Sequence, residues 1–228
     1  GLAQALAAAP RCVDPITPVP RDGPLPLSFA QQRMWFLQQL DPRSTAYVIA
    51  VTVRLDGPLD LARFERALAC VAQRHEPLRT RVIVEDGAPR AHIDPTPRVP
   101  FERVEASHLA PGERDDWARA CFAERGRRPF DLAADTLLRV VALRFDATTH
   151  AVALYLHHLV SDGLSGATLL GDLAVAYEGL ARDPAYALPS LPIQYVDWAA
   201  WQRARLSGEH LQREVAWWRA ARTWPTIT

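Results

Sequence analysis

The sequence predicts an α/β fold in which a mixed sheet packs in two layers against helices. Segments with alternating apolar residues, typical of strands, are interspersed with segments of helical periodicity. Residues 151–156 are apolar at every position, which indicates a central strand buried on both faces. The chain has 228 residues, 49% of them apolar, and is therefore long enough to bury a core of its own.

The first part of the chain predicts a linker, a helix and a strand. Six prolines between positions 10 and 26 disfavour helix, so we expect residues 1–21 to be an extended linker from an upstream domain. Ser28 and Gln31 are spaced as a capping box and predict a helix over 28–40. Residues 47–55 alternate in polarity, as a half-buried strand does.

The middle of the chain predicts a helix, a hairpin, a short strand and a further helix. Asp60 can cap an amphipathic helix that Pro77 ends. Asp86-Gly87 is a favoured two-residue turn between two strand-like runs. The expected hairpin strands are 78–84 and 90–93, and they are followed by a strand over 101–105 and a helix over 114–126.

The last part predicts the central strand pair and three helices. The runs 137–145 and 151–157 are the strongest strand patterns in the chain. A helical pattern begins near Leu164 or Ser165. A connector containing prolines then leads to two tryptophan-rich helices, over 193–205 and 209–222.

Charge and cysteine content exclude several classes of function. The formal net charge is zero, which gives no indication of binding to nucleic acid or to a membrane surface. No apolar run is long enough to span a bilayer. Cys12, Cys70 and Cys121 are odd in number and widely spaced, so we expect no metal site, no disulfide framework and a cytoplasmic location.

Two adjacent histidines, His157 and His158, end the central strand and provide the candidate chemistry. Successive strand residues point to opposite faces, so one histidine should pack or hydrogen-bond while the other is free to react. Imidazole titrates near neutral pH and can accept a proton from an amine or a hydroxyl. The N-terminus of the next helix has free amide groups that favour developing negative charge.

Asp162 and Gly163 follow the histidines in the same loop. We expect Asp162 to turn away from the catalytic histidine and to hold the loop through an arginine. Gly163 permits unusual backbone conformations and lets a substrate approach closely. A metal site made by both histidines and Asp162 is disfavoured, because the strand points the histidines apart. Ser161 lies outside any G-x-S-x-G motif, so direct transfer between two bound substrates is favoured over a covalent intermediate.

Four segments, in order, resemble the core motifs of the condensation domains of nonribosomal peptide synthetases. The loop 157–163 has the full HHxxxDG pattern, and 128–132 (RPFDL) also looks familial. The other three resembling segments are 28–37 (SFAQQRMWFL), 74–80 (RHEPLRT) and 195–201 (YVDWAAW). In the last of these, Trp198 stands where the family usually has Phe or Tyr.

The resemblance implies a chloramphenicol-acetyltransferase-like fold of two lobes and a peptide-bond-forming acyltransferase. The reaction it implies is amide formation between aminoacyl or peptidyl thioesters. Donor and acceptor carrier domains bring these substrates on phosphopantetheine arms, and no cofactor is bound directly. A neighbouring adenylation domain is an implied partner. Segments 28–37 and 74–80 resemble those of the condensation domains that join an L-configured donor to an L-configured acceptor.

The resemblance also implies roles for six residues. His158 is the catalytic residue, acting as general base or as the group that positions the amine. His157 packs, and Gly163 borders the reacting centre. Asp162 is structural and is expected to pair with Arg74 or Arg79.

The family's later motifs are missing, so the chain resembles one lobe of the domain. We expect the N-terminal lobe over 22–185, and helices leading into a missing C-terminal lobe over 186–228. Because the active site lies between lobes, we expect little catalysis by the chain alone. Two alternatives are a CoA- or carrier-dependent acyltransferase and a non-catalytic module that docks carrier domains.

Overall fold

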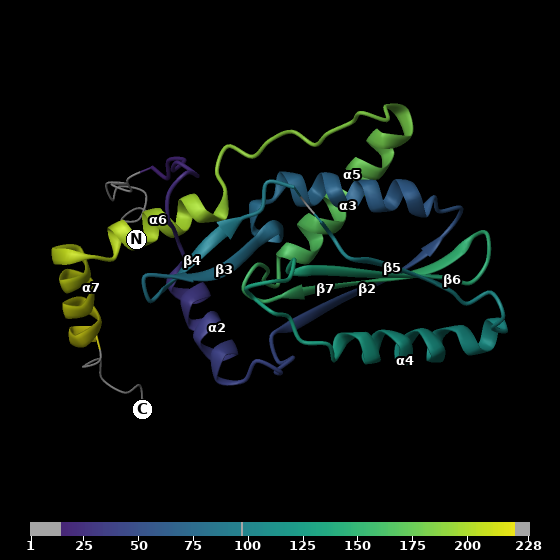
Figure 1. Ribbon diagram of the computed structural model, residues 1–228, viewed down its shortest axis with the longest axis horizontal. Helices are drawn as coiled ribbons and strands as arrows, with labels where there is room; N and C mark the ends of the chain where they lie inside the picture. Colours follow the sequence, from purple (N-terminus) through teal and green to yellow (C-terminus); the bar gives the residue numbers. More distant parts are fainter. Residues whose placement is uncertain (1–14, 97, 222–228) are drawn as a thin grey trace, which may run out of the picture.

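The computed structural model describes residues 15–96 and 98–221 (Figure 1). Residues 1–14 of the predicted linker and the last residue of the helix predicted over 209–222 lie outside this part. The helices are α2 (Phe29–Leu40), α3 (Leu61–Arg74), α4 (Arg114–Gly126), α5 (Ser165–Arg182), α6 (Tyr195–Arg205) and α7 (Gly208–Ala221), with short 3₁₀ turns η1 (Glu76–Arg79) and η2 (Pro111–Glu113). The strands are β1 (Leu25–Pro26), β2 (Val48–Asp56), β3 (Thr80–Glu85), β4 (Ala88–Ile93), β5 (Phe101–Glu105), β6 (Leu138–Arg144) and β7 (Thr149–His157).

Local sequence signals account for several of these boundaries. The Ser28 hydroxyl accepts a hydrogen bond from the Gln31 amide, and the Gln31 side chain accepts one from the Ser28 amide. This confirms the predicted capping box. The Asp60 carboxylate caps α3 by accepting from the amides at 62 and 63. The β3–β4 hairpin turns at Asp86 and Gly87, both with positive φ.

The larger sheet has the strand order β2-β7-β6-β5 and is mixed, because only β5 and β6 run parallel. Its central strand β7 is buried on both faces, as predicted. Tyr155 faces the core cluster that includes Phe122 of α4, while Leu154 faces the cluster formed with α3 and α5. Helices therefore cover both faces (Figure 1), and α4 adds a layer to the two-layer arrangement expected from the sequence.

The smaller sheet has the order β1-β4-β3, and its first strand was not predicted. Leu25 and Pro26 pair with Ala91 and Arg90 of the hairpin. A proline is tolerated here because β1 is an edge strand, where a missing amide donor need not break the sheet. Leu27, which follows, is 1% exposed and anchors the segment in the core. The proline-rich segment thus ends as part of the fold.

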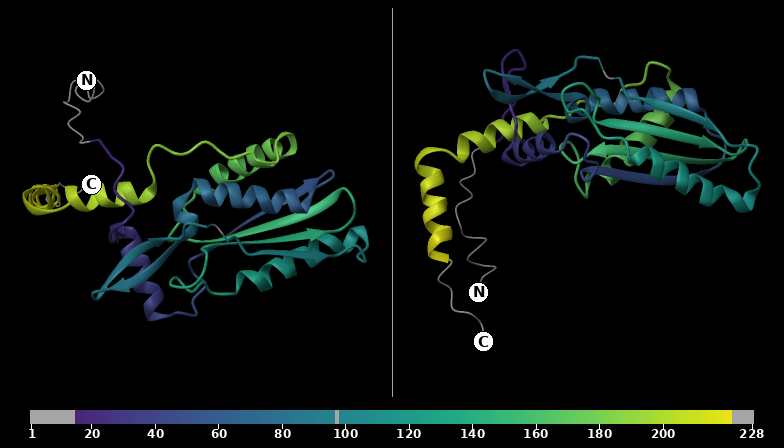
Figure 2. Two further views of the ribbon diagram at one scale, coloured as in Figure 1. Left: turned by 45° about the horizontal axis from the view of Figure 1, so that its top comes forward. Right: turned by 60° about the horizontal axis from the view of Figure 1, so that its bottom comes forward.

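Helices α6 and α7 extend from one end of the molecule (Figure 2). Trp217 and Trp218 of α7 are 61% and 63% exposed. Among residues 15–96 and 98–221, the helices are too short or too polar to cross a bilayer.

Candidate active site

His157 lies at the end of β7 and is buried. Its side chain is 1% exposed, and Nδ1 accepts a hydrogen bond from the Leu159 amide at 3.0 Å. Because Nδ1 accepts, the ring proton is assigned to Nε2, which lies 3.4 Å from Gln38 Oε1. Burial, with a smaller contribution from the adjacent His158, lowers the pKa of His157 to about 4. His157 is therefore a neutral packing residue at physiological pH.

His158 is exposed, on the opposite side of the chain from its neighbour. Its amide donates a hydrogen bond to the Tyr47 carbonyl at 2.8 Å, which fixes the backbone at the strand end. Its side chain lines a cavity of about 340 Å³, here named the His158 cavity. One histidine is therefore buried and the other is accessible, as the alternation of side chains along a strand predicted.

Within the part of the chain that the structure describes, Asp162 is held by local contacts and has no arginine partner. Its Oδ1 accepts hydrogen bonds from the Ser165 hydroxyl at 2.7 Å and from the amides of Leu164 and Ser165 at 3.0 Å. These bonds, led by that of the Ser165 hydroxyl, lower the pKa of Asp162, and His158 adds a smaller effect. The carboxylate therefore serves as an extra cap on α5 and occupies amides that the sequence analysis expected to be free.

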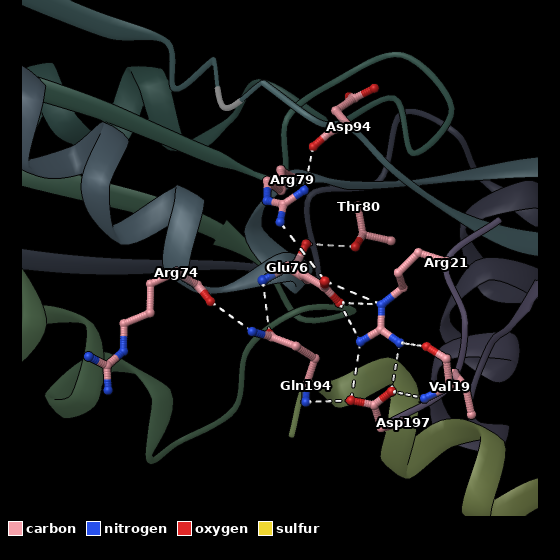
Figure 3. A network of polar contacts seen from close by, with 9 residues as sticks. All are labelled: Val19, Arg21, Arg74, Glu76, Arg79, Thr80, Asp94, Gln194 and Asp197. Atoms are coloured by element: carbon pink, nitrogen blue, oxygen red, sulfur yellow. Dashed lines mark hydrogen bonds and ion pairs between the residues drawn. The ribbon is translucent and has the colours of Figure 1, made fainter. Parts of the chain in front are cut away.

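The expected pairing of Asp162 with Arg74 or Arg79 is wrong, because both arginines have other partners. Arg74 Nε lies 3.4 Å from Asp172 Oδ2. Arg79 Nη1 donates to the Asp94 carbonyl at 2.5 Å (Figure 3). Their side chains are 20% and 11% exposed, and their ion pairs are with other carboxylates: Arg74 pairs with Asp172, and Arg79 Nη2 lies 4.0 Å from Glu76 Oε1.

Gly163 has a conventional backbone in this loop. Its φ lies outside the left-handed region, and a Cβ added to it would meet nothing within 4 Å. The expectation that position 163 needs glycine for an unusual backbone conformation is therefore wrong. The expectation that a substrate needs this space stays a prediction.

The structure adds cavity residues that sequence reasoning did not single out. Arg33 and Met34 of α2 line the His158 cavity together with Ser165 and Tyr195. Tyr195 contacts the N-cap residue of α2, since its hydroxyl lies 3.1 Å from Ser28 Oγ. Helical spacing offered one usable signal, because Ala30, Arg33 and Met34 share one face of α2.

The Leu159 carbonyl ties the histidine loop to α2, because it accepts a hydrogen bond from Gln31 Nε2 at 3.3 Å. Three of the segments predicted as motifs, 28–37, 157–163 and 195–201, thus meet at one cavity. It presents an accessible imidazole, a carboxylate and a tyrosine hydroxyl, a set that can position or deprotonate an amine. In the described ranges 15–96 and 98–221, no three histidine, cysteine or acidic side chains form a metal-binding group.

Comparison with known proteins places this geometry in a family. The family model for the condensation domain matches residues 22–225. The chain is 42% identical over 206 residues to a linear gramicidin synthase of Brevibacillus parabrevis, covering 90% of this chain and 3% of that protein. It is 37% identical over 217 residues to the phosphinothricin tripeptide synthetase PhsC of Streptomyces viridochromogenes, covering 93% of this chain and 20% of that protein.

Solved structures agree with the sequence matches. The X-domain in its complex with OxyB from teicoplanin biosynthesis superposes with a TM-score of 0.80 at 29% identity, covering 91% of this chain and 45% of that one. The first condensation domain of the CDA synthetase superposes with a TM-score of 0.74 at 25% identity, covering 90% of this chain and 50% of that one. The chain therefore spans about half of these domains and a small part of the synthetases. It belongs to the condensation-domain family of nonribosomal peptide synthetases, and its fold is one lobe of the chloramphenicol-acetyltransferase-like architecture.

Proposed function

We propose that this chain is the N-terminal lobe of a condensation domain that joins two carrier-tethered aminoacyl or peptidyl thioesters through an amide bond. The observation that carries the proposal is the division of the two histidines. His158 opens into a cavity beside Asp162 and Tyr195, whereas His157 is buried.

The proposed reaction is an acyl transfer to nitrogen. The α-amine of the acceptor attacks the carbonyl carbon of the donor thioester, so that a C–N bond forms and the C–S bond breaks. The thiol of the donor phosphopantetheine arm leaves, and the amine loses one proton. His158 is placed to take that proton or to position the amine for attack.

The other roles in the proposal follow from the contacts of each residue. His157 supports the strand end, and Asp162 caps α5 and fixes the loop. Arg74 and Arg79 stabilise the lobe through their ion pairs. Gly163 leaves room at the reacting centre.

The proposal includes partners that the chain itself does not contain. They are donor and acceptor carrier domains, a C-terminal lobe and a neighbouring adenylation domain. Residues 1–21 act as the linker from the preceding domain, and Val19 and Arg21 near its end bind Asp197 of the lobe. We further propose the type that joins an L-donor to an L-acceptor, and a cytoplasmic location.

The test is His158→Ala in the complete two-lobed domain, with both carriers loaded. We expect dipeptide formation to fall by about 100-fold or more, because general acid–base catalysis contributes that much. His92→Ala is the matched control, since His92 lies on β4 and is 46% exposed outside the His158 cavity. Equal rates for the two variants would contradict the role of His158.

The 228-residue chain alone provides a second test. If the reacting centre needs both lobes, the isolated chain should form no dipeptide above the uncatalysed rate. Robust amide formation by the chain alone would contradict this part of the proposal.

A docking module is the second candidate, favoured by one specific likeness. The X-domain that this fold resembles was solved in a complex with OxyB. If this chain only docks a partner, His158→Ala should leave both partner binding and product formation unchanged. A loss of rate with intact carrier binding supports catalysis instead.

A further inference from the structure

A second cavity adjoins the His158 cavity and has no role in the chemistry described above. Its volume is about 430 Å³, within the range of about 300–1,000 Å³ that is typical of ligand pockets. We call it the side pocket. It lies among the end of β7, the turn η1, the start of α5 and the segment leading into α6, and its apolar wall includes Pro77, Leu78, Leu156, Leu169, Ile193 and Trp198.

The two cavities share part of their lining. Val160, Asp162, Ser165 and Tyr195 border both of them. The space beside His158 and the side pocket therefore adjoin at these four residues. A group attached to the reacting centre can enter the pocket without leaving the lobe.

Three polar side chains of the side pocket form hydrogen bonds within the protein. His75 Nε2 lies 2.6 Å from Asp172 Oδ2, which in turn pairs with Arg74. The Gln194 side chain donates to the Arg74 carbonyl and accepts from the Glu76 amide (Figure 3). The carboxylate of Asp162 is bonded to α5. With these groups engaged inside the protein, most of the remaining lining is apolar, and its chemistry suits an apolar group.

One rim residue points to the same chemistry. Leu164 lines the side pocket and is 81% exposed, although it is a large apolar residue beside the reacting centre. An apolar group entering from the His158 cavity would remove part of this surface from water.

We propose that the side pocket receives the apolar side chain of one of the two residues joined at His158, and so determines specificity. This inference rests on the proposed condensation activity. The side chain that fits the pocket is leucine-like or phenylalanine-like, whether the donor or the acceptor supplies it. The experiment varies the donor and the acceptor separately, to identify which of the two substrates uses the pocket.

The kinetic test uses the complete two-lobed domain and compares leucine with alanine, first as donor and then as acceptor. In one arm we expect leucine to exceed alanine in kcat/KM by about 10-fold or more. Thr168→Trp should remove this preference, because Thr168 is an exposed residue of α5 that lines the pocket and can be enlarged without disturbing the core. Alanine substrates should keep their rate within about twofold.

Val175→Trp is the matched control, since Val175 lies on the same helix, is 50% exposed and is outside the side pocket. It should leave the leucine preference intact. The inference is overturned if Thr168→Trp slows leucine and alanine equally, or if neither arm of the active enzyme discriminates between them.

A binding experiment on the 228-residue chain separates the pocket from the catalytic proposal. Isoleucine methyl groups are labelled, and N-acetyl-leucine amide or N-acetyl-alanine amide is titrated at millimolar concentration by NMR. We expect the Ile193 methyl to shift with the leucine compound, at least fivefold less with the alanine compound, and not in Thr168→Trp. An unmoved Ile193 methyl, or an equal shift at Ile83 on β3, overturns the inference even if the enzyme is active. A selective Ile193 shift supports it even if amide formation is absent, in which case only the proposed function fails.

Discussion

Arg21 and Asp197 form an ion pair with two hydrogen bonds, in which Arg21 Nη1 and Nη2 donate to the Asp197 carboxylate at 2.7 and 3.1 Å (Figure 3). Asp197 is 1% exposed and also accepts from the amides of Val19 and Gln194 at 2.9 and 2.7 Å. Burial alone raises the pKa of Asp197, but these hydrogen bonds outweigh it and hold the pKa below its ordinary value. One carboxylate thus joins the segment before β1 to the start of α6.

Asp197→Asn should destabilise the lobe by about 3 kcal/mol, since removing one partner of a buried ion pair leaves the other poorly satisfied. Arg21 is 31% exposed and can be rehydrated, which places the loss at the lower end of the range for buried pairs. The measurement is urea unfolding at pH 7. In the same variant, the segment around Val19 should become more sensitive to proteolysis, because asparagine keeps only one of the two oxygens that bind Arg21 and the amides of Val19 and Gln194.

Asp116→Asn is the control for this prediction. Asp116 pairs with Arg119 at 2.7 Å, but the two side chains are 82% and 73% exposed. Surface pairs of this kind contribute under about 1 kcal/mol. If the two variants lose the same stability, Asp197 does not have the structural role inferred from its contacts.

The carboxylate of Asp162 should act through its capping hydrogen bonds. Asp162→Ala removes the acceptor for Leu164 and Ser165 and should cost about 1 kcal/mol of stability, as the loss of a helix cap does. Asp162→Asn keeps one oxygen acceptor and should stay closer to the parent. Thermal unfolding of the two variants at pH 7 checks the order.

The rate of amide formation in Asp162→Asn separates capping from chemistry. If Asp162 acts only as a helix cap, most of the rate should survive in the Asp162→Asn variant of the complete domain. A large loss of rate with unchanged stability would mean that the negative charge beside His158 contributes to the reaction itself.

The parts of this molecule that the sequence predicts well are those with a local physical cause. The capping box of Ser28 and Gln31 depends on residues three apart, and the alternation of His157 and His158 depends only on strand geometry. The burial of β7 on both faces follows from its own apolar composition. Each of these features is written within a few positions of the chain.

The contacts that sequence reasoning missed are long-range. Nothing near Arg74 indicates that Asp172 is its partner, and nothing near Pro26 indicates that it pairs with Arg90. The expected partner for Asp162 was wrong for a related reason. Its nearest donors were the local amides and hydroxyl at the start of α5, and they satisfy the carboxylate without an arginine.

His157 should make the stability of the lobe depend on pH. Burial lowers its pKa to about 4 in the folded protein, whereas an unfolded histidine titrates near about 6.5. Between these values the unfolded chain takes up a proton that the folded protein does not, so stability falls as pH decreases from about 6.5 toward 4. From pH 7 to pH 5, this group should remove about 2 kcal/mol.

His157→Gln tests that dependence, because glutamine does not titrate. The variant should lose packing stability at pH 7 but should show a shallower loss between pH 7 and pH 5 in urea unfolding. His150 is also buried with a lowered pKa and contributes to both proteins, so the difference between variant and parent isolates His157. An unchanged slope in His157→Gln would contradict the neutral, buried state assigned to this histidine.

Gly163→Ala should separate folding from catalysis at the reacting centre. The added Cβ meets nothing within 4 Å, and the backbone does not require glycine, so the thermal unfolding midpoint should match that of the parent. If a substrate passes close to this backbone, the methyl group should lower kcat/KM in the complete domain by about 10-fold, since small displacements of reacting atoms are costly. Gly171→Ala on α5, where a Cβ also meets nothing within 4 Å, is the matched control and should leave the rate unchanged. Parental activity in Gly163→Ala would show that the space beside Gly163 is not used by the substrates.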